Sequence, residues 1–209
     1  MKYLFTIVAT VLLFNFSSAV AQDNKAKKIL DDVVEKIESF NSMKIQFDYI
    51  MKNEAEGINE IFKGSLTSSK NMFNLKVAGQ VIITNGETLW TYIPDIEEVQ
   101  ISTLDNSNGS MNPTEMLKNY ADNFNVKLIS SNANTSVIEL LPKKEAKFKH
   151  AEVVINNKTN LFSSFIISDE IGNKFIYKVN ELIPNIALKA NKFTFTKKDY
   201  PNVDFIDMR

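Results

Sequence analysis

The spacing of apolar residues near the start of the chain predicts one amphipathic helix. Between Lys25 and Phe40, apolar side chains recur every three or four residues, so they fall along one face of an α-helix. The residues of this stripe are Ile29, Leu30, Val33, Val34, Ile37 and Phe40. Because an apolar stripe must be covered, we expect this helix to pack across a sheet.

Beyond the helix the pattern changes to a period of two, which predicts strands. Apolar and polar side chains alternate over residues 44–52, with Ile50 as the exception. The apolar positions of this strand are Ile45, Phe47, Tyr49 and Met51. Similar runs follow, separated by turn dipeptides, and they indicate about ten strands. No helical crossover separates them, so we expect an antiparallel sheet.

Two local signals interrupt the run of strands. Asn85-Gly86 predicts a hairpin with a type I′ turn, in which both central residues have positive φ. Further on, Asn112 can cap a short helix that extends to Phe124, with Pro113 at its first position and Glu115 completing a capping box. The preceding segment, 105–112, is rich in Ser, Asn and Gly and predicts a mobile loop, which either tethers a lid or is a plain connector.

Residues 1–21 predict a secretory signal peptide. Lys2 supplies a positive start, residues 3–16 are almost wholly apolar, and a small-x-small cleavage signal precedes Gln22. An uncleaved anchor is less favoured, because the apolar stretch is shorter than the roughly 20 residues that cross a bilayer. The chain has no cysteine, so the mature N-terminus cannot be lipidated on one. We expect a single soluble domain over residues 22–209, free in the compartment that it enters.

The composition argues against most catalytic chemistry and against a nucleic-acid partner. Without residues 1–21, which hold one Lys and no acid, the 24 basic residues become 23 against 25 acidic ones, so no basic surplus is available to neutralise phosphates. The only histidine is His150, and no P-loop, dinucleotide fingerprint or nucleophile elbow occurs. We expect no enzyme, no metal and no cofactor. The carboxylates of Glu97, Glu98, Asp204 and Asp207 keep a two-carboxylate hydrolase open as a disfavoured alternative.

The abundance of phenylalanine is the more informative feature. Twelve of the 15 Phe residues lie beyond residue 21, and many fall on predicted strands. They indicate either a filled barrel or sandwich core or a barrel that leaves an apolar cavity for a ligand. The period of the pattern alone does not choose between the two.

Several segments, in this order along the chain, resemble the LolA family of periplasmic lipoprotein carriers. Residues 71–75 (NMFNL) resemble its Phe-rich strand, and residues 85–94 (NGETLWTYIP) resemble its central hairpin. Residues 169–173 (DEIGN) match a turn of the family. Residues 192–195 (KFTF) and 201–207 (PNVDFID) resemble the motifs at the C-terminal end of the family. The resemblance spans nearly the whole chain beyond residue 21.

The resemblance implies a mainly β fold: an incomplete, unclosed antiparallel β-barrel or strongly curved sheet, covered by about two to three helices that act as a lid. It implies that apolar residues line an acyl-chain cavity, for which the candidates are Phe47, Phe62, Phe73, Leu75, Trp90, Tyr92, Phe165 and Phe175. The candidate lid residues are Ile29, Val33, Ile37, Met116, Leu117 and Tyr120.

The function implied by the resemblance is a monomeric periplasmic carrier, or chaperone, that ferries acylated lipoproteins from the inner to the outer membrane. Its partners would be an inner-membrane lipoprotein-releasing ABC transporter and an outer-membrane acceptor protein or the outer membrane itself. Where family members hold their lid with an Arg-Pro pair, this chain has residues 68–71 (SSKN), so Lys70 is the candidate latch, although a lysine offers only a point charge. The alternative reading is a periplasmic sensor or binding module for acylated ligands on the same fold.

Overall fold

The computed structural model describes residues 16–104 and 113–209. Three α-helices and one 3-10 helix lie in these ranges: α2 (Phe16–Glu38), α3 (Pro113–Lys118), α4 (Tyr120–Asn123) and η1 (Pro94–Ile96). The strands are β1 (Met43–Asn53), β2 (Ile58–Ser69), β3 (Met72–Val77), β4 (Gln80–Thr84), β5 (Thr88–Ile93), β6 (Glu98–Thr103), β7 (Phe124–Ser131), β8 (Thr135–Pro142), β9 (His150–Asn156), β10 (Leu161–Ser168), β11 (Lys174–Pro184) and β12 (Asp204–Asp207).

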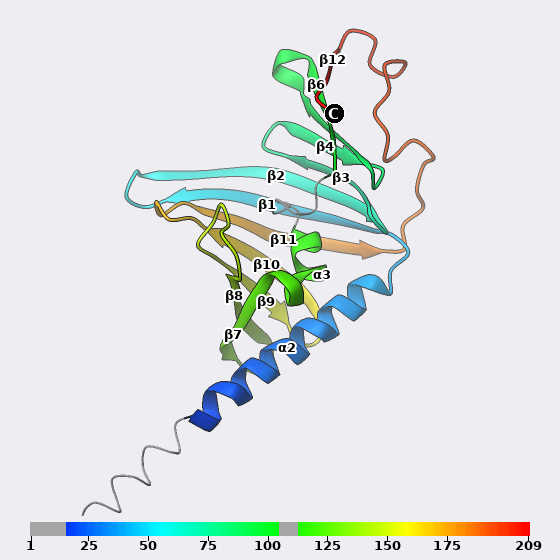
Figure 1. Cartoon of the computed structure of the whole chain (residues 1–209). Helices are drawn as coiled ribbons and strands as arrows, with labels where there is room; N and C mark the ends of the chain where they lie inside the picture. The colour runs from blue at the N-terminus through cyan, green and yellow to red at the C-terminus, as the bar shows by residue number, and fades with distance from the viewer. Residues whose placement is uncertain (1–15, 105–112) are drawn as a thin grey trace, which may run out of the picture.

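All twelve described strands form one sheet in the order β12-β6-β5-β4-β3-β2-β1-β11-β10-β9-β8-β7. The order does not close on itself, and Figure 1 shows a strongly curved sheet with β12 and β7 at its two edges. The predicted unclosed, curved sheet with covering helices is therefore confirmed. One pairing departs from the expected antiparallel sheet, because β12 runs parallel to β6. A parallel pair requires a long connection, and residues 185–203 between β11 and β12 supply it.

The long helix α2 lies across the sheet, as the apolar stripe predicts (Figure 1). It packs against β7, β10 and α3. It ends at Glu38 instead of Phe40, because the last turn tightens: the Phe40 amide donates to the carbonyl of Ile37. It also begins earlier than expected, at Phe16, and so runs through the predicted cleavage junction, whose processing stays a prediction.

The predicted second helix is two short helices. α3 begins at Pro113, as expected, while its predicted cap Asn112 and the predicted loop 105–112 lie outside the described residues. The helical run is interrupted at Asn119, and it ends at Asn123 instead of Phe124. The reason is that Phe124 is the first residue of β7, where it pairs with Pro142 of β8.

The hairpin at Asn85-Gly86 exists, but its turn is not type I′. Thr84 pairs with Leu89, so four residues connect the paired positions. Gly86 has φ +98, whereas Asn85 is not among the residues with positive φ. Instead, the Asn85 side-chain oxygen accepts hydrogen bonds from the amides of Glu87 and Thr88 at 3.0 and 2.9 Å. The asparagine therefore closes the turn through its side chain.

Candidate functional site

The concave face of the sheet and the helices above it enclose the larger of two hydrophobic clusters. The cluster joins α2, α3 and α4, here called the lid, to inward-facing residues of β1–β3 and β7–β11. Alternation on β1 sets the pattern, since Ile45, Phe47 and Tyr49 are buried while the residues between them are more exposed. This covered face is the place where an acyl chain would be sheltered, so it is the candidate site.

Most residues expected at the cavity and the lid meet in this cluster. Four of the cavity candidates are buried there: Phe47, Phe73, Leu75 and Phe165. Phe175 is half-buried against it. Of the lid candidates, Val33, Ile37, Met116, Leu117 and Tyr120 are buried in the cluster and Ile29 is half-buried against it. The structure therefore brings these residues into one apolar layer between lid and sheet.

Trp90 and Tyr92 do not lie on the concave face, which corrects their expected place among the cavity residues. Phe73 pairs with Thr84, and Thr84 pairs with Leu89, so the concave face continues through Leu89 and the next residue, Trp90, faces the other way. Both aromatic residues pack in the second cluster, formed with Ile83, Val99, Phe195 and Val203. The C-terminal segment covers them there, with the Phe195 and Tyr200 rings stacked 4.0 Å apart.

Phe62 shares the concave face but lies outside the covered part of the site. It pairs with Tyr49 across the β1–β2 hairpin, and the two rings are 6.5 Å apart. Tyr49 is 6% exposed, whereas Phe62 is 36% exposed, so the ring of Phe62 lies where the covered face opens to water.

A small void lies beneath the lid. A void of about 10 Å³ remains between α3 and the sheet, lined by Ile45, Phe47, Leu66, Leu75, Thr114, Phe162, Tyr177 and Val179. Such a void holds about one water, whereas pockets for small ligands are about 300–1,000 Å³. This void is therefore too small for an acyl chain, because the rings of Phe47, Phe162 and Tyr177 line it closely.

Phe47 owes its position to a glycine on the neighbouring strand. Gly64 pairs with Phe47, and a Cβ atom added to Gly64 would lie 2.2 Å from the Phe47 ring. The ring therefore lies directly over the Gly64 backbone, which only glycine permits. This contact flattens Phe47 onto the sheet at the wall of the void.

Aromatic rings line the concave face from its exposed end to the void. Tyr49 stacks parallel to Phe175 at 6.5 Å and contacts Tyr177 at 5.1 Å, and Tyr177 contacts Phe47 at 5.4 Å. Burial raises the pKa of both Tyr49 and Tyr177 above its ordinary value. The sequence pattern placed Tyr49 on the buried face of its strand, but neither tyrosine was expected at the site.

Polar contacts fasten the two short helices of the lid, one to α2 and one to the sheet. The Tyr120 hydroxyl on α4 donates to the carboxylate of Asp31 on α2 at 2.5 Å and lies 3.2 Å from the carbonyl of Lys27. Burial and the Asp31 carboxylate both raise the pKa of Tyr120. At the other end, the Lys118 ammonium on α3 donates to the carbonyl of Lys70 at 3.2 Å.

The contact at Lys70 differs from the expected latch. Its side chain is exposed, and it is its backbone carbonyl that receives the hydrogen bond, with the charge supplied by Lys118. Lys70 adopts φ +52 at the turn between β2 and β3. The lid is therefore bonded to residue 70, but the lysine side chain that makes the bond is Lys118 of α3.

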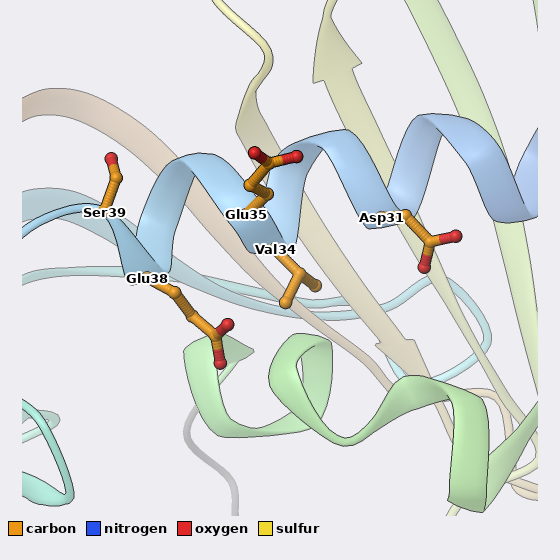
Figure 2. Close-up of a pocket in the computed structure, with 5 residues that line it drawn as sticks. All are labelled: Asp31, Val34, Glu35, Glu38 and Ser39. Carbon is orange, nitrogen blue, oxygen red and sulfur yellow. The ribbon is translucent and has the colours of Figure 1, made fainter.

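The larger surface hollow, an open groove of about 520 Å³, does not suit an acyl chain. Four of its five lining residues, Asp31, Val34, Glu35 and Glu38, lie on α2, and the fifth, Ser39, directly follows the helix. Three of the five carry carboxylates. Figure 2 shows Val34 and Glu38 directed toward the two short helices, with Glu35 and Ser39 pointing away from them. Because an acyl chain needs apolar walls, the candidate site remains the covered face under the lid and not this groove.

The carboxylates and the histidine considered for catalysis lie away from the void. Glu98 and Asp204 pair across β6 and β12 at one edge of the sheet, and Asp207 is bound by Arg209. His150 lies 3.6 Å from Glu152 on β9. Among the described residues, no group of three or more potential ligands could hold a metal ion. Residues 16–104 and 113–209 also contain no helix that is long and apolar enough to cross a membrane.

Comparisons with known proteins converge on one family. The profile of the family described as "Outer membrane lipoprotein carrier protein LolA" matches residues 38–196. A protein of Francisella philomiragia named outer-membrane lipoprotein carrier protein is 26% identical over 212 aligned residues, which cover 99% of this chain and 98% of the relative. A protein of the same name from Serratia proteamaculans is 24% identical and covers 91% of this chain and 92% of the relative. An uncharacterized conserved protein from Thermus thermophilus has a similar fold, with a TM-score of 0.58 over 88% of this chain and 99% of that one at 13% identity.

Proposed function

The chain belongs to the LolA family of outer-membrane lipoprotein carrier proteins, and from that premise we propose that it shelters the acyl chains of lipoproteins beneath its lid and ferries them from the inner to the outer membrane. The observation that carries the proposal is the apolar layer between the lid and the concave face, built from side chains with no catalytic chemistry. On this proposal the protein is a binding and transport protein and not an enzyme.

The energetics of lipid transfer explain why such a carrier is needed. Each acyl methylene exposed to water costs about 0.8 kcal/mol, so two or three chains cost on the order of tens of kcal/mol. A carrier must cover most of that surface and still release it. An apolar layer without a charged clamp inside fits this requirement, because it binds by burial alone and gives the cargo up to another apolar site.

Because the void beneath the lid is so small, binding must open the lid. The void of about 10 Å³ is too small for an acyl chain, so on this proposal the described form is the closed one. Opening separates α3 and α4 from the sheet and breaks the Tyr120–Asp31 and Lys118–Lys70 hydrogen bonds. The aromatic rings that fill the closed interior then become the walls of the binding site.

The compartment and the partners form part of the same proposal. Residues 1–21 act as the signal peptide, and residues 22–209 form the mature periplasmic domain. The carrier receives its cargo from an inner-membrane lipoprotein-releasing ABC transporter and delivers it to an outer-membrane acceptor protein or to the membrane itself. We expect it to act as a monomer.

A fluorescent fatty-acid probe tests the binding step. We expect the purified domain to bind the probe and an acylated lipopeptide to displace it, because both compete for the apolar face under the lid. The same peptide without its acyl chains is the matched control and should not displace the probe. Equal displacement by both peptides, or no probe binding at all, contradicts the proposal.

A further inference from the structure

The exposed apolar residues at one end of the sheet form a surface that the closed site does not explain. At the free end of the β1–β2 hairpin, Ile58 and Phe62 are 40% and 36% exposed on the concave face. The half-buried Phe175 of β11 lies on the same face, since it pairs with Met51, the second residue after Tyr49 on β1. These three residues are here called the rim. Contiguous exposed apolar surface is a mark of binding sites, whereas apolar residues exposed singly need no explanation.

The rim continues into the covered site without a polar break. Tyr49 contacts both rim aromatics, with ring centroids 6.5 Å from Phe62 and 6.5 Å from Phe175. From Tyr49 the ring contacts pass through Tyr177 to Phe47, and the last two residues line the void. A chain of rings therefore leads from water to the space under α3.

Lid contacts cover other parts of the apolar face. The helix α2 packs against β7 and β10, and the Lys118 contact fastens α3 to the turn between β2 and β3. The turn between β1 and β2 lies at the far end of β1 from α2, at the left of Figure 1. The rim is thus the end of the apolar face that these lid contacts leave free.

We propose that the acyl chain of the cargo enters and leaves the carrier at the rim and slides along the rings of Phe62, Phe175 and Tyr49 to the space under α3. This inference rests on the proposed function and adds the route of the ligand. It follows from energetics: along this path each methylene passes from one apolar contact to the next, whereas a route past the carboxylates of α2 exposes it to water and charge.

The absence of cysteine allows the route to be blocked at a single position. In Phe62→Cys and Ile61→Cys, the thiol is the only one in the chain and can be labelled with a bulky maleimide. Ile61 is the matched control because it is the next residue on β2, is 61% exposed, and faces the opposite side through its pairing with Ile50. Each variant is compared before and after labelling, so any effect of the substitution on folding is separated from the block.

The readout is the association rate of the fluorescent fatty-acid probe. We expect the label at position 62 to slow association and dissociation by about tenfold or more, and the label at position 61 to leave both rates unchanged. Equal rates for the two labelled proteins, or a label at 62 that changes only dissociation, would overturn the route while equilibrium binding still supports the carrier function. Failure of the unlabelled wild-type protein to bind the probe would instead overturn the proposed function and the route with it.

Discussion

The hydrogen bond between Tyr120 and Asp31 allows the closed lid to be weakened without touching the binding surface. The bond joins α4 to α2 at 2.5 Å, and the acceptor is a carboxylate. Hydrogen bonds to charged groups contribute about 1.5–3 kcal/mol, and we take the lower end because Asp31 is exposed on its helix. Removing the hydroxyl in Tyr120→Phe keeps the buried ring and removes this bond together with the longer contact to the Lys27 carbonyl.

The expected result is a protein that is less stable but binds more tightly. If the ligand binds only the open form, its apparent affinity is proportional to the open fraction. Since about 1.4 kcal/mol corresponds to a factor of ten, Tyr120→Phe should raise the affinity for the acyl probe by up to about tenfold. The free energy of unfolding should fall by about 1–1.5 kcal/mol, which is a shift in Tm of roughly 2–5 °C for a domain of this size.

The assay pairs probe titration with urea unfolding of the same preparation. Tyr200→Phe is the control, since the Tyr200 ring stacks on Phe195 on the opposite face, away from the lid. It should leave probe affinity unchanged. If Tyr120→Phe loses stability and its affinity falls or stays constant, then lid opening does not limit binding and the reasoning is refuted.

Three further results are expected. The charge introduced by Phe73→Glu should weaken probe binding at least tenfold. Trp90→Glu, on the opposite face, should lower stability with little effect on probe binding. Comparable losses of binding in titrations of the two variants would contradict the assignment of faces. Gly64→Ala should cost about 1–3 kcal/mol in urea unfolding because its Cβ would meet the Phe47 ring, and a neutral result would contradict the close approach. Burial raises the pKa of Tyr177 above the ordinary 10.0, so the folded state keeps this proton to a higher pH than the unfolded state. The free energy of unfolding should therefore fall as pH rises above 10. A Tyr177→Phe variant whose free energy of unfolding falls equally steeply with pH would refute this cause.

The curved sheet and the covering helix could be predicted because each depends on a local pattern and on the family resemblance. The stripe on α2 and the alternation on β1 gave the correct buried faces, down to Val33 and Phe47. The predicted helix end at Phe124 was wrong, because helix capping signals do not show that this residue pairs with a neighbouring strand.

The faces of successive strands could not be read with the same certainty. Alternation shows that Trp90 and Tyr92 share a face, but only the registers of two hairpins place that face opposite Phe73. A shift of one residue at the turn after Thr84 would have reversed the result. Likewise, the parallel strand β12 follows a long connection whose direction no local pattern records.

The packing of the interior was beyond prediction for a different reason. The abundance of phenylalanine is compatible with a hollow or a filled barrel, and the volume left over depends on side-chain positions such as that of Phe47 over Gly64. The polar contacts of the lid were also missed. Lys118 reaches a backbone carbonyl, and any residue at position 70 would offer one, so the sequence carries no signal for that contact.

The most direct measurement of the central claim is a transfer assay with inner-membrane vesicles that contain a lipoprotein, its releasing transporter and ATP. After incubation with the purified domain of residues 22–209 and sedimentation of the vesicles, we expect the lipoprotein in the supernatant, bound to the carrier. A lipoprotein that stays in the membrane pellet, at the level seen without the carrier, would contradict the account.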